Sequence, residues 1–432
     1  MNYQEGKDYL DSISKKGIIL GLESMRNLLD ELGNPQDDLK FVHLAGTNGK
    51  GSVLAYVASI TQKAGYKTGQ YTSPPLISRR EQIQLNGEWI SKEDFTRLVE
   101  KVKNAIDCLE KKNKVLPTVF EVETAIAFLY FKEVDCDIVI LETGMGGRDD
   151  ATNVIKDTLV AGFTSVSLDH MSFLGETIEE IATVKAGIIK ANGIVVSGIQ
   201  KPSVLEIIRE KASKELATFD FVDEDDIEVI EERYNQQVFT YKSNPPFTIQ
   251  MAGSHQVENA AVALEIIQKL KGLGFEITPW DIKAGLFETK VFGRFSIIGE
   301  KPIFIVDGAH NENGVLRLRD NIIRLFPNKK ITFIMGIYKD KKVDEIVRQM
   351  LPLAKAVYTV SLANERRTLT AVELKERCEK YDDNVHVLPC MSIKEAVELA
   401  LGDAGEDGVV IALGSLSYLG TVAKEKEVLK RI

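Results

Sequence analysis

Residues 41–52 read FVHLAGTNGKGS, an apolar run followed by a glycine-rich turn and a lysine. This order predicts a buried strand, a loop and the first turn of a helix. The backbone N–H groups of such a loop converge on one point, where the helix N-terminus and the Lys50 ammonium add positive charge. The segment therefore predicts a site for a nucleotide triphosphate.

The match to the usual phosphate-loop pattern is incomplete. That pattern has glycine at the position of Leu44 and Ser or Thr directly after the lysine. Here Gly51 follows Lys50, and Ser52 comes one residue later. A glycine-rich strand–helix turn without a ligand is the simpler alternative.

Short apolar runs alternate with helical patterns along most of the chain. The predicted strands are 41–46, 137–143, 159–167 and 193–198, then 303–306, 331–336, 356–361, 385–388 and 408–413. The predicted helices are 52–64, 120–132 and 178–189, then 313–325, 343–351, 371–381 and 393–401. The strand runs are almost continuously apolar, which is typical of parallel sheets covered on both faces.

We predict an α/β protein of two domains. Residues 1–292 would form a phosphate-loop domain with a mostly parallel sheet, and residues 293–432 a Rossmann-like α/β domain. The alternating segments 237–241 and 247–251 predict a small antiparallel subdomain on the first domain. The acidic run at 223–226 reads as a solvated loop.

Composition excludes several classes of function. The formal net charge is −10, so general affinity for nucleic acid is not expected. The four cysteines are widely spaced without a C-x-x-C pair, which argues against a zinc site or a disulfide framework. No apolar stretch reaches membrane-spanning length, and no signal peptide is apparent. We therefore expect a cytoplasmic protein that binds neither nucleic acid nor membrane.

Two polar residues follow predicted strands. Glu142 ends an apolar strand and precedes the glycine-rich run GMGGR, and His170 follows the strand 159–167. The carboxyl ends of the strands form the ligand edge of open α/β sheets. A carboxylate beside a phosphate loop is a natural Mg²⁺ ligand. An incidental acid in a turn and a structural histidine are the alternatives.

Three further segments carry candidate residues. Lys185 lies in an otherwise apolar helical stretch, where it is either a desolvated reactive amine or a surface lysine with a buried stem. Residues 253–263 combine a polar turn with a helix of small residues, which Ser254 could simply cap. Arg294, in Gly-Arg-Phe, would stabilise the charge of phosphoryl transfer if it met a triphosphate.

Together these motifs resemble the Mur ligase superfamily, and within it the folylpolyglutamate synthase/dihydrofolate synthase family, over essentially the whole chain. The landmarks are GLESM at 21–25, GTNGKGS at 46–52, TSPPL at 72–76, GGRDDATN at 146–153, DH at 169–170, KAGI at 185–188, DGAHN at 307–311 and GSLSY at 414–418. One such motif would be weak, but their number and order are specific.

The resemblance implies an ATP-dependent carboxylate–amine ligase of folate metabolism. ATP would phosphorylate the carboxylate of folate or dihydropteroate, and the amine of L-glutamate would displace phosphate. Such an enzyme makes dihydrofolate, polyglutamylates tetrahydrofolate, or does both, and the sequence leaves this choice open. We expect a monomer.

By motif match, the resemblance also implies the site residues. Gly49, Lys50, Gly51, Ser52, Asn259, Arg294 and Asp307 would bind ATP. Ser73, Glu142 and His170 would hold Mg²⁺, and a carbamate on Lys185 would help to hold a second Mg²⁺. His310 would lie near the transferred phosphoryl group or the incoming glutamate. Thr118, Phe120 and Asp150 would line the pterin site.

Two positions depart from the family pattern, and two other classes of protein share part of it. Pro75 stands where family members often have His, and Asp149 stands where they often have Leu. A cell-wall precursor ligase is disfavoured, because only about forty residues precede the phosphate loop, too few for a further α/β domain. A nucleotide-switch protein is the alternative from another class.

Overall fold

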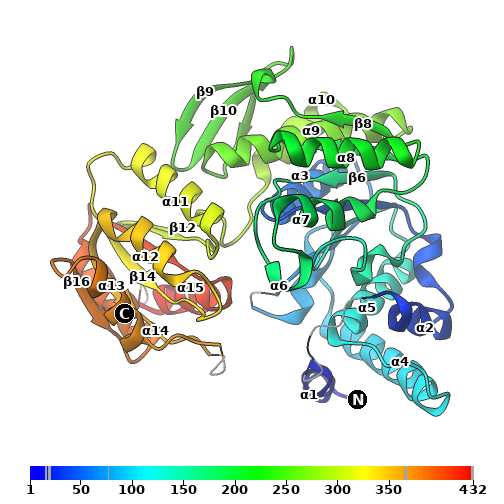
Figure 1. Ribbon diagram of the computed structural model, residues 1–432, viewed down its shortest axis with the longest axis horizontal. Helices are drawn as coiled ribbons and strands as arrows, with labels where there is room; N and C mark the ends of the chain where they lie inside the picture. The colour runs from blue at the N-terminus through cyan, green and yellow to red at the C-terminus, as the bar shows by residue number, and fades with distance from the viewer. Residues whose placement is uncertain (15–16, 18–20, 76, 364–366, 430–432) are drawn as a thin grey trace. The chain divides into compact units, whose positions relative to one another are not determined.

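A computed structural model describes residues 1–14, 17, 21–75, 77–363 and 367–429; Leu76 of the TSPPL motif lies outside them. The chain forms two compact units (Figure 1). The first comprises Met1–Glu228, Thr240–Phe247 and Glu258–Thr289, and the second comprises Val229–Phe239, Thr248–Val257 and Lys290–Ile432. The predicted class, two α/β domains with mostly parallel sheets, is confirmed. The boundary at 292/293 stays a prediction, and the chain passes between the units more than once.

The first unit is built on an eight-stranded sheet with the order β4-β3-β2-β5-β1-β6-β7-β8. Its strands are β1 (Phe41–Ala45), β2 (Thr68–Tyr71), β3 (Ile83–Leu85), β4 (Glu88–Trp89), β5 (Ile138–Glu142), β6 (Val160–Phe163), β7 (Ile194–Ser197) and β8 (Thr218–Phe221). From β2 to β8 every neighbouring pair is parallel. The carboxyl ends of these strands therefore meet at one edge of the sheet.

Helices cover both faces of this sheet. They are α1 (Tyr3–Ser14), α2 (Glu23–Glu31), α3 (Lys50–Lys63), α4 (Lys92–Lys111), α5 (Val119–Glu133), α6 (Met171–Leu174), α7 (Ile178–Lys185), α8 (Pro202–Lys214), α9 (Ser254–Gly272) and α10 (Pro279–Glu288). Side chains alternate along β1, so Phe41 and Ala45 point to one face and pack in the clusters of α5 and α7, respectively. Leu44 points to the other face, where Gly162 lets it approach Ile266 of α9.

The structure adds elements that the apolar pattern does not predict. β2 reads TGQY, which is half polar, yet Thr68 and Tyr71 are buried because the strand pairs with both β3 and β5. The helix predicted over 178–189 ends at Lys185 and continues as a 3-10 turn, Ala186–Ile188. β8, which is not among the predicted strands, extends the large sheet at its edge.

A three-stranded sheet, β11-β10-β9, follows β8 in the chain. Its strands are β9 (Ile227–Arg233), β10 (Gln236–Tyr241) and β11 (Phe247–Ile249). A two-residue turn joins β9 to β10, which requires antiparallel strands. The acidic run at 223–226 precedes this sheet, and Asp223, Glu224 and Asp225 are exposed, as expected of a solvated loop.

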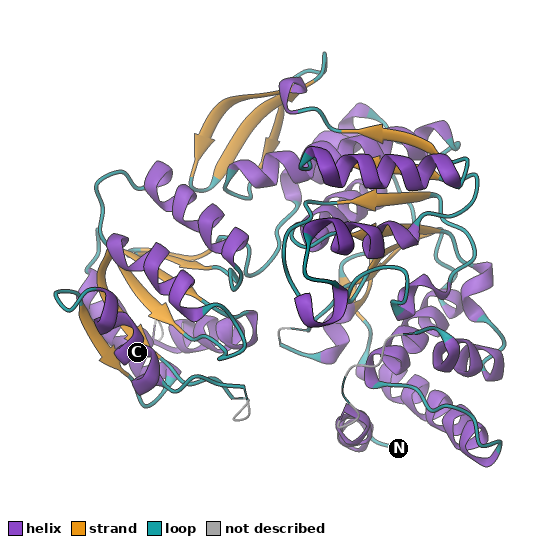
Figure 2. Cartoon of the chain, in the orientation of Figure 1, coloured by secondary structure: helices purple, strands orange, loops and turns teal. Residues whose placement is uncertain are grey.

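The second unit contains a six-stranded sheet, β12-β13-β17-β14-β15-β16. Its strands are β12 (Ser296–Glu300), β13 (Ile303–Val306), β14 (Ile331–Met335), β15 (Ala354–Thr359), β16 (His386–Pro389) and β17 (Val409–Leu413), and its helices are α11 (Glu312–Leu325), α12 (Val343–Met350), α13 (Ala371–Tyr381), α14 (Ile393–Ala404) and α15 (Leu419–Leu429). Helices α11 to α13 pack on one face, while α14 and α15 pack on the other (Figure 2). Only β12 is antiparallel to its neighbour. None of the helices in the described part of the chain has both the length and the apolar character that crossing a bilayer requires.

Candidate active site

The segment 41–52 forms the strand, loop and helix that its sequence predicts. β1 ends at Ala45 and α3 begins at Lys50, with Gly49 at the N-cap in the left-handed region (φ 96°). A Cβ atom at Gly49 would lie 2.4 Å from Oδ1 of Asn259. Glycine is thus required twice, by its backbone angle and by the close approach of α9. The structure places Asn259 directly against the loop.

The Lys50 side chain points back into the glycine-rich loop that precedes it. Its Nζ donates to the Gly46 carbonyl at 3.1 Å and approaches the Thr47 carbonyl at 3.4 Å. Nζ also lies 3.7 Å from Oε1 of Glu142. Both side chains are largely buried, with 14% and 8% of their surfaces exposed. The ammonium is therefore held at the mouth of the cradle, where it can exchange its carbonyl contacts for anionic oxygens.

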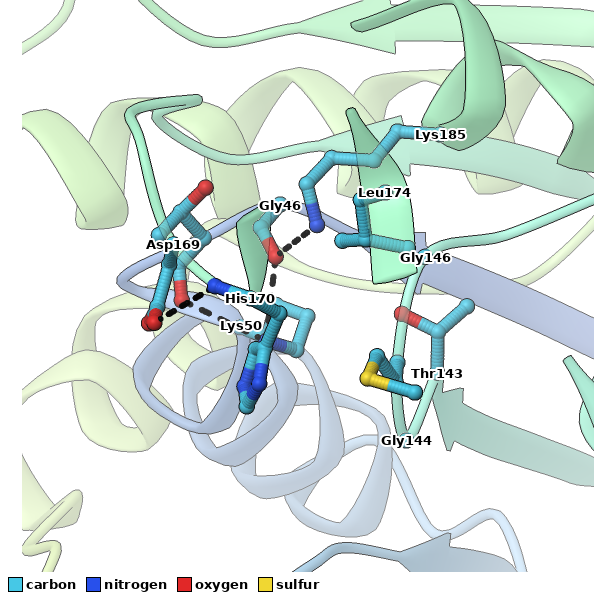
Figure 3. Close-up of a pocket in the computed structure, with 11 residues that line it drawn as sticks. Gly46, Lys50, Thr143, Gly144, Gly146, Asp169, His170, Leu174 and Lys185 are labelled. Carbon is cyan, nitrogen blue, oxygen red and sulfur yellow. Dashed lines mark hydrogen bonds between the residues drawn. The ribbon is translucent and has the colours of Figure 1, made fainter. Parts of the chain in front are cut away.

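A second lysine reaches the same carbonyl from another helix. Lys185, the last residue of α7, is 4% exposed, and its Nζ donates to the Gly46 carbonyl at 2.8 Å. In Figure 3 the Lys50 and Lys185 side chains converge on this oxygen. Burial, and secondarily the charge of Lys50, lower the pKa of Lys185 to about 7. A substantial fraction of this amine is neutral near pH 7, as the sequence-based reading of a desolvated lysine requires.

Glycines fix the end of α7 at this position. A Cβ at Gly147 would lie 2.6 Å from the Lys185 carbonyl, and one at Gly187 would lie 2.6 Å from Cα of Arg148. The Arg148 N–H donates to the Val184 carbonyl at 2.9 Å. The loop after β5 therefore packs backbone to backbone on the segment that carries Lys185, and side chains would separate them.

The two lysines line a pocket at the carboxyl edge of the sheet. Its lining is Gly46, Thr47, Lys50, Thr143, Gly144, Met145, Gly146, Asp169, His170, Leu174 and Lys185 (Figure 3). His170 adopts a left-handed conformation (φ 50°) at the start of α6, and its N–H donates to Asp169. The pocket brings together Lys50, Lys185 and His170 from three separate motifs.

The residues at this edge fit a hard cation bound with phosphates. Glu142 ends β5 and is 6% exposed. Ser73 follows the neighbouring strand β2 at the same edge but is not among the pocket-lining residues. The buried hydroxyl of Thr143 has no hydrogen-bond partner among the described residues. A carboxylate, a hydroxyl and an uncommitted hydroxyl are donors that suit Mg²⁺.

Thr118, Phe120 and Asp150 also belong to the first unit. Thr118 caps α5 through a capping box with Glu121. Phe120 lies against Gly144, since a Cβ there would be 2.4 Å from its Cζ, and its ring is 6.2 Å from that of Tyr71. Asp150 is buried, and its carboxylate accepts hydrogen bonds within its own loop. The aromatic pair is a suitable wall for a flat ring, whereas the observed contacts of Asp150 are internal.

The second unit holds Arg294, Asp307 and His310. The Asp307 carboxylate accepts N–H groups from Phe295 and Ala309, both at 2.8 Å. Burial raises the pKa of Asp307, while these bonds and the charge of Arg294 oppose the rise. His310 Nδ1 lies 2.7 Å from the Gly308 carbonyl oxygen. Because a carbonyl oxygen can only accept, Nδ1 carries the hydrogen and donates it, and in the neutral ring Nε2 carries none. The loop of Arg294 and the loop of His310 are thus tied together.

Sequence analysis missed several lining residues. Thr143, Met145 and Asp169 line the pocket, but sequence analysis assigned a role to none of them, although Met145 lies in the GMGGR run and Asp169 in the DH landmark. Thr143 could have been found from its position after Glu142, because adjacent residues at a strand end supply both faces of the sheet edge. The motifs contain Met145 and Asp169 but do not show that these residues line a pocket, since that depends on how the loops fold.

Comparisons with known proteins show the family of the chain. The family described as Mur ligase middle domain matches residues 44–267, and the Mur ligase glutamate ligase domain matches residues 293–416. The dihydrofolate synthase/folylpolyglutamate synthase of Bacillus subtilis is 34% identical over 429 residues, which is 98% of each chain.

Solved structures of the same family are also similar to this chain. The folylpolyglutamate synthase of Thermotoga maritima is 34% identical, with a TM-score of 0.84 over 98% of this chain and 96% of that one. Escherichia coli FolC, solved with DHPP and ADP, is 28% identical, with a TM-score of 0.86 over 100% of this chain and 98% of that one.

Proposed function

The chain belongs to the folylpolyglutamate synthase/dihydrofolate synthase family of Mur ligases, and on that premise we propose that it joins L-glutamate to a folate or dihydropteroate carboxylate at the expense of ATP. The observation that carries the proposal is the convergence of Lys50 and Lys185 on the Gly46 carbonyl. The Lys50 cation at the mouth of a phosphate loop suits a reaction in which negative charge is transferred as a phosphoryl group, and the partly neutral Lys185 amine beside it can form a carbamate.

The reaction has two steps. The acceptor carboxylate attacks the γ-phosphorus of ATP, which gives an acyl phosphate and ADP. The neutral amine of glutamate then attacks the acyl carbon, phosphate leaves, and the amine loses a proton as the amide forms. No side chain need act as a covalent nucleophile, so the protein contributes position and charge.

The roles follow the motif matches. The N–H groups of Gly49, Gly51 and Ser52 and the ammonium of Lys50 would hold the β- and γ-phosphates. Asn259, Arg294 and Asp307 would complete nucleotide binding. His310, whose Nδ1–H is fixed by Gly308, would present Nε2 to the phosphoryl group or the glutamate.

Magnesium would be held by Ser73, Glu142 and His170, and a second ion by a carbamate on Lys185. Bound there, Mg²⁺ would supply positive charge that offsets the charge of the phosphates. The protein's share is to keep these oxygen and nitrogen donors at one sheet edge. ADP in the E. coli FolC structure supports the nucleotide part of this assignment.

Weakening the metal ligands is expected to raise the Mg²⁺ requirement. Glu142→Gln removes an anionic oxygen and His170→Ala removes a nitrogen, so each should shift the half-saturating Mg²⁺ concentration upward by about tenfold or more. Titration of ligase activity with Mg²⁺ measures this shift. Glu288→Gln, which alters a surface partner of Lys63, is the control. Curves for both variants that overlay the wild type would place the metal elsewhere.

The acceptor would lie along Thr118, Phe120 and Asp150, with its ring against Phe120. We also propose that the enzyme is a cytoplasmic monomer; its four cysteines are free, which suits a reducing compartment. Mass spectrometry of products, with dihydropteroate and tetrahydrofolate offered separately, tests the function and identifies the preferred acceptor. ATP turnover should be strictly dependent on glutamate. Hydrolysis that continues unchanged without glutamate or acceptor would indicate a nucleotide switch instead.

A further inference from the structure

His43 is a buried histidine that the proposed mechanism does not use. It lies in the middle of β1 and is 0% exposed. Its Nε2 is 2.8 Å from Oγ1 of Thr152, in the 3-10 turn Ala151–Val154, far along the chain. Buried polar side chains that reach across a fold usually fix the geometry of a neighbouring segment.

The direction of the hydrogen bonds follows from simple chemistry. The Thr152 hydroxyl donates its only hydrogen to Oδ1 of Asp150, at 2.5 Å. It must therefore accept from His43, so the imidazole carries its proton on Nε2. Burial, with a further effect of the Lys190 charge, lowers the pKa of His43 to about 3, which keeps the ring neutral.

The chain of bonds continues to the pocket. Asp150 Oδ1 also accepts the Thr152 N–H at 3.0 Å, and Oδ2 accepts the Met145 N–H at 2.7 Å. Met145 lines the pocket, and its neighbour Gly144 lies against Phe120. A continuous path of hydrogen bonds thus links the centre of the sheet to the loop between the phosphate cradle and the aromatic wall.

We propose that His43 is a positioning residue: its Nε2–H fixes the Thr152 hydroxyl, which fixes the Asp150 carboxylate, which holds the loop at Gly144 and Met145. Without that donor the hydroxyl is free to turn away from Asp150, and the carboxylate loses one of its hydrogen bonds. The loop would then move relative to Phe120. The consequence for the acceptor rests on the proposed function, whereas the consequence for the loop does not.

The test compares His43→Leu with His43→Gln. Leucine fills the space without a donor, whereas the Gln amide presents an N–H near the position of Nε2. We expect His43→Leu to raise KM for the pterin-linked acceptor about tenfold, with KM for ATP changed less than about twofold. His43→Gln should recover to within about threefold of the wild type.

Hydrogen exchange gives a readout that needs no activity. Peptides spanning residues 143–150 should exchange faster in His43→Leu and at the wild-type rate in His43→Gln. Thr152→Val should reproduce the leucine variant and Thr152→Ser should restore protection, which keeps the test valid if His43→Leu does not fold. Thr61→Val is the matched control, because Thr61 is equally buried but bonds within α3 and to Thr68.

The outcomes separate the two proposals. Wild-type exchange of the loop in His43→Leu and Thr152→Val would overturn the role of His43, as would a glutamine variant as impaired as the leucine variant. If the wild-type protein shows no ligase activity at all, the proposed function is overturned. If exchange of the loop is still faster in His43→Leu and Thr152→Val, the positioning role of His43 stands.

Discussion

Replacing Lys50 with alanine is expected to abolish ligation in a protein that remains folded. Lys50 is the cation at the mouth of the phosphate loop, and its contacts are two carbonyl oxygens and a 3.7 Å approach to Glu142. None of these contacts belongs to the hydrophobic core. A charge-assisted bond to the transferred phosphate has no replacement nearby, since the Lys185 amine is already shifted toward its neutral form.

The loss should be at least about 10³-fold in kcat/KM, the scale seen when a positioned charge donor is removed from a transition state. Glutamate- and acceptor-dependent release of phosphate measures it, and calorimetric titration with ATP measures the nucleotide affinity separately. Lys63→Ala is the control on the same helix, because Lys63 pairs with Glu288 at the surface. Near-normal turnover in a folded Lys50→Ala protein would contradict the nucleotide assignment.

Replacing Lys185 with arginine is expected to be nearly as damaging, although the substitution keeps a long basic side chain at this position. A carbamate forms when the neutral amine attacks CO₂: a new N–C bond forms as one C=O π bond opens, one proton leaves the nitrogen, and the neutral amine becomes an anionic carbamate. Arginine stays protonated and cannot follow this route. Activity should fall by about 10²-fold or more, and added bicarbonate should not recover it.

The carbamate itself can be observed by carbon NMR after addition of ¹³C-bicarbonate. With a pKa of about 7, the Lys185 amine is mostly protonated at pH 6 and mostly neutral at pH 8, so the signal should grow as the pH rises across this range. Lys190→Arg is the matched control: burial also lowers the pKa of Lys190, to about 8, but its amine donates to Asn153. A fully active wild type without any carbamate signal would return Lys185 to a structural role.

Local pattern was sufficient for much of the fold. The apolar run at 41–45 and the glycines after it specify a strand and a tight loop in any context, because both follow from side-chain size and backbone freedom. Five strands of the second unit were also predicted from their apolar runs, and for Ile303–Val306 the predicted and observed bounds coincide. The predictions that Glu142 binds Mg²⁺ and that Lys185 carries a carbamate also came from local context and family motifs.

Tertiary structure decided what local pattern could not. β2 is a strand because β3 and β5 pair with its polar residues, not because of its own composition. Phe120 lies against the loop after β5 because Gly144 has no side chain to exclude the ring. In both cases the deciding contact comes from a distant part of the chain, where local periodicity carries no information.

The functional site shows the same division most clearly. The sequence identified Lys50 and Lys185 as candidates, but it could not show that both amines reach one carbonyl oxygen at Gly46. Nor could it show that burial of Lys185, together with the charge of Lys50, lowers the pKa of Lys185. It also gave no reason to single out His43, whose role depends on Thr152 and Asp150. Residue type and spacing determine which chemistry is available, whereas burial, distance and the direction of hydrogen bonds arise only when segments far apart in the chain pack together.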